Sequence, residues 1–235
     1  MHKACITKVL WGGQDMIYTT SEDRTIKIWD TTGKILKNLS SHAHWVNCIS
    51  ANTGFALRTG CNDHKLTRYE TREKMKQVAL EKYNKLKGPN DERIVTGSDD
   101  CSLYMWCPAK SSQPTVRLLG HQQPVNHVQF SPNAQYIVSA SYDKSIRLWN
   151  GTTGEKLSVC RGHIAAVYLI SWSLDSRMLV SASKDSTMKI WDAKTRKLMF
   201  DLPGHADEVY AIDWSPDGQK VASGSKDRML RIWKN

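Results

Sequence analysis

The sequence predicts an all-β protein in which a unit of short strands recurs as the blades of a β-propeller. One stretch occurs three times in the second half of the chain with almost unchanged spacing, and its copies carry His121, His163 and His205 at intervals of 42 positions. In each copy a tryptophan follows this histidine by 28 positions. A repeat of about 40–45 residues with an early Gly-His and a late Trp is typical of propeller blades.

Less regular copies extend the repeat toward the N-terminus. The closing motif recurs at Ser21–Trp29 and Ser98–Trp106, and a version with Tyr in place of Trp lies at Cys61–Tyr69. The six closing aromatic residues are separated by 40, 37, 43, 42 and 42 positions: Trp29, Tyr69, Trp106, Trp149, Trp191 and Trp233. The sequence therefore predicts one domain over residues 1–235, a WD40 β-propeller of six repeats.

Each repeat is expected to contain short strands separated by turns. Ser131–Asn133 and Ser215–Gly218 are predicted to connect first and second strands, and Gly151–Gly154 follows a third strand. Proline fixes φ and glycine permits positive φ, so these sequences favour turns. Four antiparallel strands in each blade, packed on the neighbouring blades, would leave only short exposed edges.

Residues 70–93 interrupt this pattern, because they lack the Gly-His motif. Either the strands are degenerate here or an amphipathic helix is inserted, and the spacing of the apolar residues favours the helix. The apolar residues at helix-like spacing and the lysines among them are Met75, Val78, Ala79, Tyr83 and Leu86, and Lys74, Lys76, Lys82, Lys85 and Lys87.

The two ends of the sequence predict an incomplete or open ring. Met1-His2 takes the place of Gly-His in the first repeat, so the first strand of a blade follows it. Leu230–Trp233 has the pattern of a third strand, and only two residues come after it. A closing fourth strand is therefore missing from the sequence, and we expect an edge that invites aggregation or a partner strand.

A His, a Ser and an Asp recur together in the regular repeats, as the members of a nucleophilic triad would. An active site is not normally built three times, so we interpret the set as a buried hydrogen-bond network with the closing Trp. Its members are His121, Ser139, Asp143 and Trp149; His163, Ser181, Asp185 and Trp191; and His205, Ser223, Asp227 and Trp233. Similar sets are expected at His2/Thr19/Asp23/Trp29 and His42/Thr59/Asp63/Tyr69, whereas the repeat ending at Trp106 lacks a His.

No catalytic, cofactor or metal site is predicted. His42-Ala43-His44 has no second pair of ligands at useful spacing. The sequence contains no glycine-rich phosphate loop. Six cysteines form no CxxC pair, and no apolar run has the length of a signal peptide or a membrane span, so we expect reduced thiols and no membrane contact.

The net charge of +10 is the main clue from composition. A basic protein of this size attracts polyanions such as RNA, although Lys and Arg also keep a β-rich surface soluble. A partner surface is expected around the central channel, where the residues just before and just after the first-strand Val and the residue preceding the turn Asp would point. These are Trp45, Asn47, Asn126, Tyr142, Tyr168, Lys184, Glu208, Tyr210 and Lys226, with Glu22, Asn62 and Asp99 at further turn positions. Exposed aromatics beside lysines are typical of a binding face, although the aromatics could instead pack between blades.

Several segments go beyond the general repeat and resemble the Notchless family over essentially the whole chain. They are Ser139–Ile146, Arg161–Tyr168 and Asp201–Tyr210, together with His44–Asn47, Phe55–Gly60 and Ala79–Tyr83. The resemblance implies a non-catalytic factor of large (60S) ribosomal subunit assembly in the nucleus and nucleolus, which docks on preribosomal RNA and protein through its propeller.

The family also engages a midasin-type AAA+ ATPase through an N-terminal ubiquitin-like domain. This sequence contains no counterpart of that domain and only six of the family's eight blades, so the ATPase contact is not carried over. Two alternatives remain open at this point. One is a general protein-interaction or signalling scaffold of Notch-pathway type, and the other is a truncated product without independent function.

Overall fold

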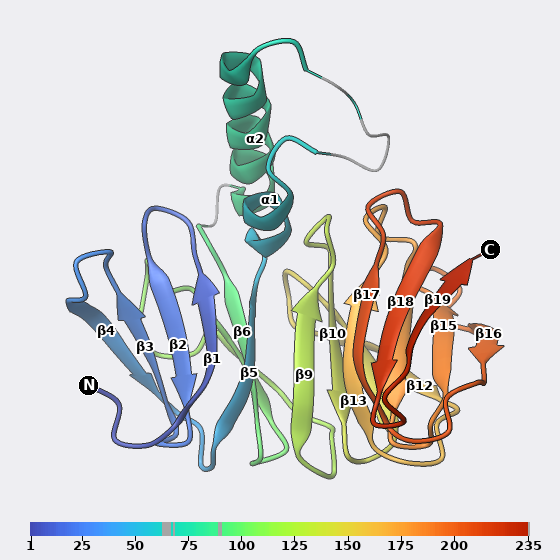
Figure 1. Ribbon diagram of the computed structural model, residues 1–235. Helices are drawn as coiled ribbons and strands as arrows, with labels where there is room; N and C mark the ends of the chain where they lie inside the picture. The colour runs from blue at the N-terminus through green and yellow to red at the C-terminus, as the bar shows by residue number, and fades with distance from the viewer. Residues whose placement is uncertain (63–66, 68, 89–90, 235) are drawn as a thin grey trace.

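The computed structural model describes residues 1–62, 67, 69–88 and 91–234, and within them nineteen strands form five antiparallel sheets in a row (Figure 1). The all-β, open-propeller fold class is therefore confirmed. Blade 1 contains β1 (Ile6–Trp11), β2 (Ile17–Ser21), β3 (Thr25–Trp29) and β4 (Ile35–Ser40), and blade 2 contains β5 (Val46–Ala51), β6 (Ile94–Ser98), β7 (Leu103–Trp106) and β8 (Val116–Leu118).

The other three blades follow without interruption. Blade 3 contains β9 (Val125–Phe130), β10 (Tyr136–Ser141), β11 (Ser145–Asn150) and β12 (Lys156–Arg161). Blade 4 contains β13 (Val167–Trp172), β14 (Met178–Ser183), β15 (Met188–Asp192) and β16 (Leu198–Leu202), and blade 5 contains β17 (Val209–Trp214), β18 (Lys220–Ser225) and β19 (Leu230–Lys234).

The prediction of six repeats is wrong for the described part of the chain, where five blades are present. β5 pairs with β6, with Val46 opposite Ser98 and Ala51 opposite Ile94, so both strands belong to blade 2. The segment between them, residues 52–93, is an insertion of about one repeat length. Because its length matches the period, the regular spacing of aromatic residues continued across it and imitated a sixth unit at Cys61–Tyr69.

The insertion contains two helices, α1 (Gly54–Thr59) and α2 (Arg72–Lys87), which project from one face of the ring (Figure 1). The Thr71 hydroxyl caps α2 by accepting from Lys74 N at 3.3 Å, and Gly88 at its C-terminal end has a φ of 64°. Glycine tolerates that backbone conformation without strain. The half-buried side of α2 is formed by Val78, Ala79, Lys82, Tyr83, Leu86 and Lys87, and its N-terminal turns are exposed.

A buried carboxylate fixes the insertion to blade 1. Glu92 accepts hydrogen bonds from Gly13 N at 3.1 Å, from Tyr18 OH at 2.6 Å and from the Thr53 hydroxyl. Tyr83 of α2 packs over Gly13 so closely that a Cβ there would lie 1.8 Å from its hydroxyl oxygen. The turn between β1 and β2 therefore holds the base of α2 in place.

The core lies between the blades. The face that a blade turns to the next blade in the chain is called its forward face, and the opposite one its rear face. Ile26 and Ile28 on the forward face of blade 1 pack with Val46 and Ile49 on the rear face of blade 2. Three further clusters of buried residues repeat this arrangement between the later blades.

The row of blades is open at both ends. In the described residues no fourth strand pairs with β19, whereas the other four blades each have one. Ile6 and Val9 on the rear face of blade 1 are exposed, as are Leu230 and Ile232 on the forward face of blade 5. Neither described helix is long and apolar enough to cross a membrane.

Candidate protein-interaction face

Each of the five described blades carries one His–Asp–hydroxyl–Trp network. In blade 3, His121 Nδ1 lies 2.8 Å from Asp143 Oδ2, His121 Nε2 lies 2.7 Å from Ser139 Oγ, and Trp149 Nε1 donates to the same Oγ at 2.9 Å. The structure brings together the other sets in the same way, as His2/Thr19/Asp23/Trp29, His163/Ser181/Asp185/Trp191 and His205/Ser223/Asp227/Trp233.

The donors in the network determine its protonation state. An indole N–H can only donate and an ionised carboxylate can only accept, so Trp149 donates to Ser139 Oγ and His121 Nδ1 donates to Asp143. In the neutral imidazole Nε2 then carries no proton, and it accepts from the Ser139 hydroxyl. Burial alone would raise the pKa of Asp143, but the hydrogen bonds from His121 and Ser145 outweigh burial and hold that pKa well below its usual range. Burial lowers the pKa of His121, which keeps the imidazole neutral.

The network of blade 2 differs from the one predicted. His42 Nδ1 lies 2.9 Å from Asp100 Oδ2, and His42 Nε2 lies 2.9 Å from Thr96 Oγ1, which also accepts from Trp106 Nε1 at 2.9 Å. The expectation that the repeat ending at Trp106 lacks a histidine is therefore wrong. Thr59, the predicted partner of His42, instead donates to Phe55 O within α1 at 2.7 Å. Two other predicted partners, Asp63 and Tyr69, belong to the insertion, and Asp63 lies outside the described residues.

The network serines cannot be reached by a substrate. Ser139 and Ser181 are fully buried, and Ser223 is almost so, with a Trp indole bonded to each hydroxyl. Their connectivity matches a catalytic triad, but a nucleophile must be able to contact the reacting carbon. The described residues contain no cluster of three or more His, Cys, Asp or Glu side chains arranged to hold a metal ion.

The Asp of each network fixes a turn that shapes one face of the ring. In blade 3 the residue before this Asp, Tyr142, donates its backbone N–H to Pro124 O at 3.1 Å, just ahead of β9. We call the surface formed by these turns and by the loops before the first strands the loop face; α1 and α2 project from the opposite face (Figure 1). Equivalent bonds join Glu22 N to Cys5 O, Asp99 N to Trp45 O, Lys184 N to Ala166 O and Lys226 N to Glu208 O, at 2.9–3.0 Å.

Three tyrosines from blades 3, 4 and 5 form a row on the loop face. The rings of Tyr142 and Tyr168 meet edge to face with centroids 6.2 Å apart, and those of Tyr168 and Tyr210 are stacked at 5.2 Å. Glu208 accepts from Tyr168 OH at 2.8 Å and from Tyr210 OH at 2.5 Å. Tyr142 and Tyr210 nevertheless remain 44% and 48% exposed, so the row offers aromatic surface to a partner.

The charged groups beside this row are largely paired with one another. Hydrogen bonds from Tyr210 and Tyr168 lower the pKa of Glu208, so its carboxylate stays charged. Lys184 Nζ lies 4.0 Å from Glu208, and Lys226 Nζ lies 3.8 Å from Asp207, with both lysines more than half exposed. Exposed ion pairs of this kind contribute little to stability. Both lysines can therefore exchange these partners for a bound ligand at small cost.

The remaining predicted residues divide into exposed and structural positions. Trp45 is exposed, 5.4 Å from the His44 ring. Asn47 donates to Val125 O at 3.1 Å and Asn126 donates to Val167 O at 2.8 Å, so both side chains connect adjacent blades. Asn62, expected in a turn of the loop face, lies instead in the insertion, where its carbonyl accepts from Lys82.

The pairing of Glu208 with two tyrosines was not predicted, although the sequence contains a signal for it. Tyr168 and Tyr210 are one period of 42 residues apart, so they occupy the same position in adjacent blades.

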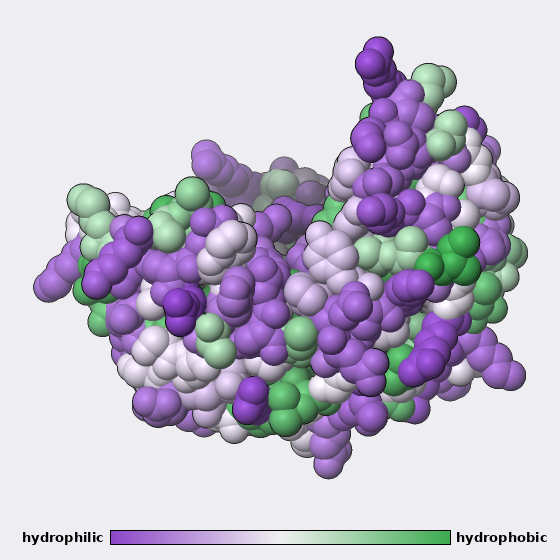
Figure 2. Space-filling model, turned by 90° about the horizontal axis from the view of Figure 1, so that it is seen from below, coloured by the Kyte–Doolittle hydropathy of each residue, from purple (hydrophilic) through white to green (hydrophobic). Residues whose placement is uncertain are grey.

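The molecule seen from below has a mostly hydrophilic surface in which apolar residues form small separate groups (Figure 2). Recognition by this surface would therefore combine a few aromatic contacts with polar ones.

Known proteins support the repeat and the resemblance. The chain is 51% identical over 132 residues to ribosome assembly protein 4 of Saccharomyces cerevisiae, covering 55% of this chain and 26% of that protein. It is 57% identical over 102 residues to the Notchless protein homolog of Arabidopsis thaliana (43% and 21%), and 44% identical over 140 residues to protein Notchless of Drosophila melanogaster (57% and 28%). The predicted resemblance to Notchless is confirmed, and the chain spans about a quarter of the length of these relatives.

The model of the WD domain, G-beta repeat, matches five segments: residues 2–30, 87–107, 112–150, 154–192 and 196–234. Each segment ends one residue after the closing Trp of a blade. The insertion is matched only at its end, which agrees with five blades rather than six. Since these segments cover well over half of the sequence, the chain belongs to the WD40 repeat family.

Proposed function

We propose that this chain is a non-catalytic scaffold of ribosome assembly that docks on a preribosomal particle of the large (60S) subunit in the nucleus and nucleolus. The similarity to ribosome assembly protein 4 and to Notchless proteins supports the assembly role. We infer that it docks through the loop face, because Tyr142, Tyr168 and Tyr210 form an exposed row there.

The chemistry of the loop face favours a protein component as the direct contact there. Tyrosines bury large rigid surfaces at low entropic cost and are enriched among residues that dominate interfaces. Glu208 and Asp207 lie within reach of Lys184 and Lys226, so the surface presents both signs of charge. A polyanion would gain little from such a balanced surface. Contact with preribosomal RNA is assigned instead to the opposite face, where exposed Lys74, Lys76 and Lys85 of α2 project.

The test is co-sedimentation of the tagged chain with 60S precursors in a nuclear extract. We expect Tyr142→Ala combined with Tyr210→Ala to reduce the sedimenting fraction at least tenfold, because each ring loses an interface contact of about 1–2 kcal/mol. Leu36→Ala is the matched control, since Leu36 is an exposed apolar residue of β4, away from both the tyrosine row and α2. Unchanged sedimentation of the double variant would refute docking through the loop face.

The same experiment separates this proposal from a general interaction or signalling scaffold. A scaffold of that kind would be recovered with other proteins and would remain at the top of the gradient. Wild-type chain that does not sediment with 60S precursors, yet binds a defined protein through the loop face, would favour the alternative.

A further inference from the structure

Two cavities meet at α1, on the side of the ring opposite the loop face. Phe55 and Arg58 of α1 line both of them. The smaller cavity, of 220 Å³, lies against the inner strands β1, β5 and β9. The larger cavity, of 550 Å³, lies against the ends of β13 and β17. The two cavities are therefore adjacent, and a single ligand could occupy both.

The larger cavity has the lining of a site for a flat aromatic group. Arg58 spans it, because its guanidinium lies 5.3 Å from the centre of the Phe55 ring and its Nη2 lies 3.6 Å from Asp213 Oδ1 of β17. Aromatic rings and guanidinium planes are the surfaces on which unpaired nucleobases stack. The apolar walls of the cavity are formed by Phe55, Trp172, Leu174, Trp214 and Pro216.

A buried donor at the wall of this cavity lacks an acceptor. Trp172 is 1% exposed, and its Nε1 has no hydrogen-bond partner among the described residues. Trp214 occupies the same position in the next blade, where its Nε1 donates to Ser171 O at 3.2 Å. A buried N–H without an acceptor costs free energy. A ligand with acceptor atoms on a flat ring, as nucleobases have, suits this wall.

The smaller cavity combines positive charge with unpaired polar groups. Lys8 and Arg58 line it, and no carboxylate does so in the described part of the chain. His127 Nδ1 and Gln129 Oε1 belong to its lining residues and are buried without a partner. Burial, and secondarily the charge of Lys8, lowers the pKa of His127 to about 4, whereas a facing carboxylate would raise it. The cavity therefore suits an anion that accepts from Lys8 and Arg58.

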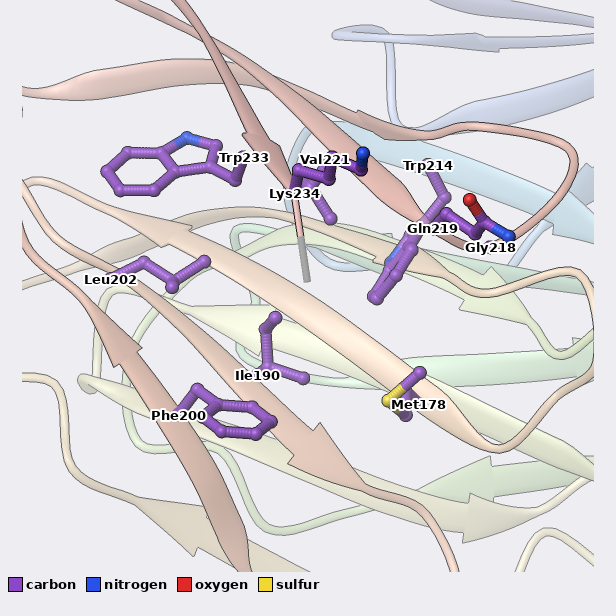
Figure 3. Close-up of a pocket in the computed structure, with 10 residues that line it drawn as sticks. All are labelled: Met178, Ile190, Phe200, Leu202, Trp214, Gly218, Gln219, Val221, Trp233 and Lys234. Atoms are coloured by element: carbon purple, nitrogen blue, oxygen red, sulfur yellow. The ribbon is translucent and has the colours of Figure 1, made fainter.

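A third cavity shows the contrast. It has a volume of 190 Å³ and lies between blades 4 and 5, where Ile190, Phe200 and Leu202 give it a mainly apolar lining (Figure 3). Lys234 is its one charged lining residue among those the structure describes. This cavity borders β19, whereas neither cavity at α1 includes a residue of that strand. Only the pair at α1 places a cationic compartment beside an aromatic one.

We propose that the two cavities at α1 bind one unpaired nucleotide of RNA. Its base occupies the larger cavity beside Trp214, and its phosphate lies in the smaller cavity between Lys8 and Arg58. The proposal deepens the RNA contact proposed for this face and rests on it. Lys85 of α2 lines a further cavity that also borders Phe55, so the positive charge continues toward the neighbouring phosphates. A duplex is excluded, because its bases are paired and stacked within the helix.

The probe is a fluorescein-labelled RNA of about 12 nucleotides without internal base pairs, followed by fluorescence anisotropy with the full 235-residue chain. Two competitors carry the same backbone charge: the duplex of this RNA with its complement, and an abasic ribose-phosphate chain of equal length. We expect each to bind at least tenfold more weakly than the single strand, because neither can place a base on the aromatic wall. A poly-glutamate peptide of equal charge should not compete.

The matched protein variants are Arg58→Gln and Arg161→Gln, which remove one exposed positive charge each. Arg161 ends β12, away from both cavities. Arg58→Gln should weaken RNA binding at least tenfold and reduce the preference for intact RNA over the abasic chain, whereas Arg161→Gln should bind like the wild type.

The comparison of ligands on the wild-type chain decides the proposal even if Arg58→Gln fails to fold. Equal binding of the single strand and the abasic chain overturns it, because charge alone would then explain the affinity. Competition by poly-glutamate also overturns it, because the site would then accept an acidic polypeptide. Co-sedimentation with 60S precursors is measured separately, so either result leaves docking through the loop face to its own test.

Discussion

Replacement of His163 by Ala tests whether the repeated networks stabilise the fold. The imidazole is buried, and it bonds Asp185 Oδ2 at 2.9 Å and Ser181 Oγ at 2.8 Å. After truncation Ser181 still accepts from Trp191, and Asp185 still accepts from Ile164 N at 3.0 Å. Two net hydrogen bonds are lost at about 0.5–1.5 kcal/mol each, so the free energy of unfolding should fall by about 1–3 kcal/mol.

Urea unfolding followed by tryptophan fluorescence measures this change, and the slope of the transition should stay constant. His44→Ala is the control, because the His44 side chain is 54% exposed and only approaches Asp99 at 3.5 Å. The control should stay within about 0.5 kcal/mol of the wild type. A His163→Ala variant as stable as the His44→Ala variant would refute the structural role of the network.

Three further changes test other parts of the molecule. Burial, and secondarily the charge of Lys8, lowers the pKa of His127 from 6.5 to about 4. As the pH falls below 6.5, His127 is therefore protonated in the unfolded chain before it is protonated in the folded chain, and the free energy of unfolding should fall by up to about 3 kcal/mol by pH 4. His127→Gln should reduce this loss in urea titrations. Glu92→Gln places an amide among three hydrogen-bond donors, so it should lower the free energy of unfolding by about 1–3 kcal/mol and speed tryptic cleavage within α2. Unchanged cleavage would contradict the attachment of the insertion to blade 1 through Glu92. Charge reversal of the exposed α2 residues Lys74, Lys76 and Lys85 should weaken binding to rRNA fragments and reduce the salt dependence of that binding, without altering the melting temperature. Unaltered RNA binding would place the RNA contact elsewhere.

The regular repeats could be predicted from sequence because one local pattern determines one local structure. His121, Ser139, Asp143 and Trp149 recur at fixed spacing, and the geometry of a single blade brings them together. The same periodicity identified the positions of Tyr142, Tyr168 and Tyr210 on one face. Where the pattern is strictly periodic, sequence and structure agree.

Blade 2 could not be predicted in the same way, because its pairing crosses an insertion. His42 reaches Asp100 across 58 positions, and nothing in the local sequence distinguishes this partner from Asp63. The attachment of α2 through Glu92 also depends on contacts between distant segments, because Gly13 and Tyr18 lie 79 and 74 positions away from Glu92 in the sequence. Such long-range pairings depend on tertiary structure rather than on periodicity.

Site-specific photocrosslinking in assembling preribosomes tests the central claim most directly. A photoreactive amino acid replaces Lys184 beside the tyrosine row, and in a second variant it replaces Leu80 of α2 on the opposite face. We expect the Lys184 position to crosslink to a protein of the 60S precursor and the Leu80 position to give no such protein crosslink. Protein crosslinks to the 60S precursor from the Leu80 position and none from the Lys184 position would contradict docking through the loop face. Crosslinks only to proteins that are not part of a preribosomal particle would contradict the role in ribosome assembly.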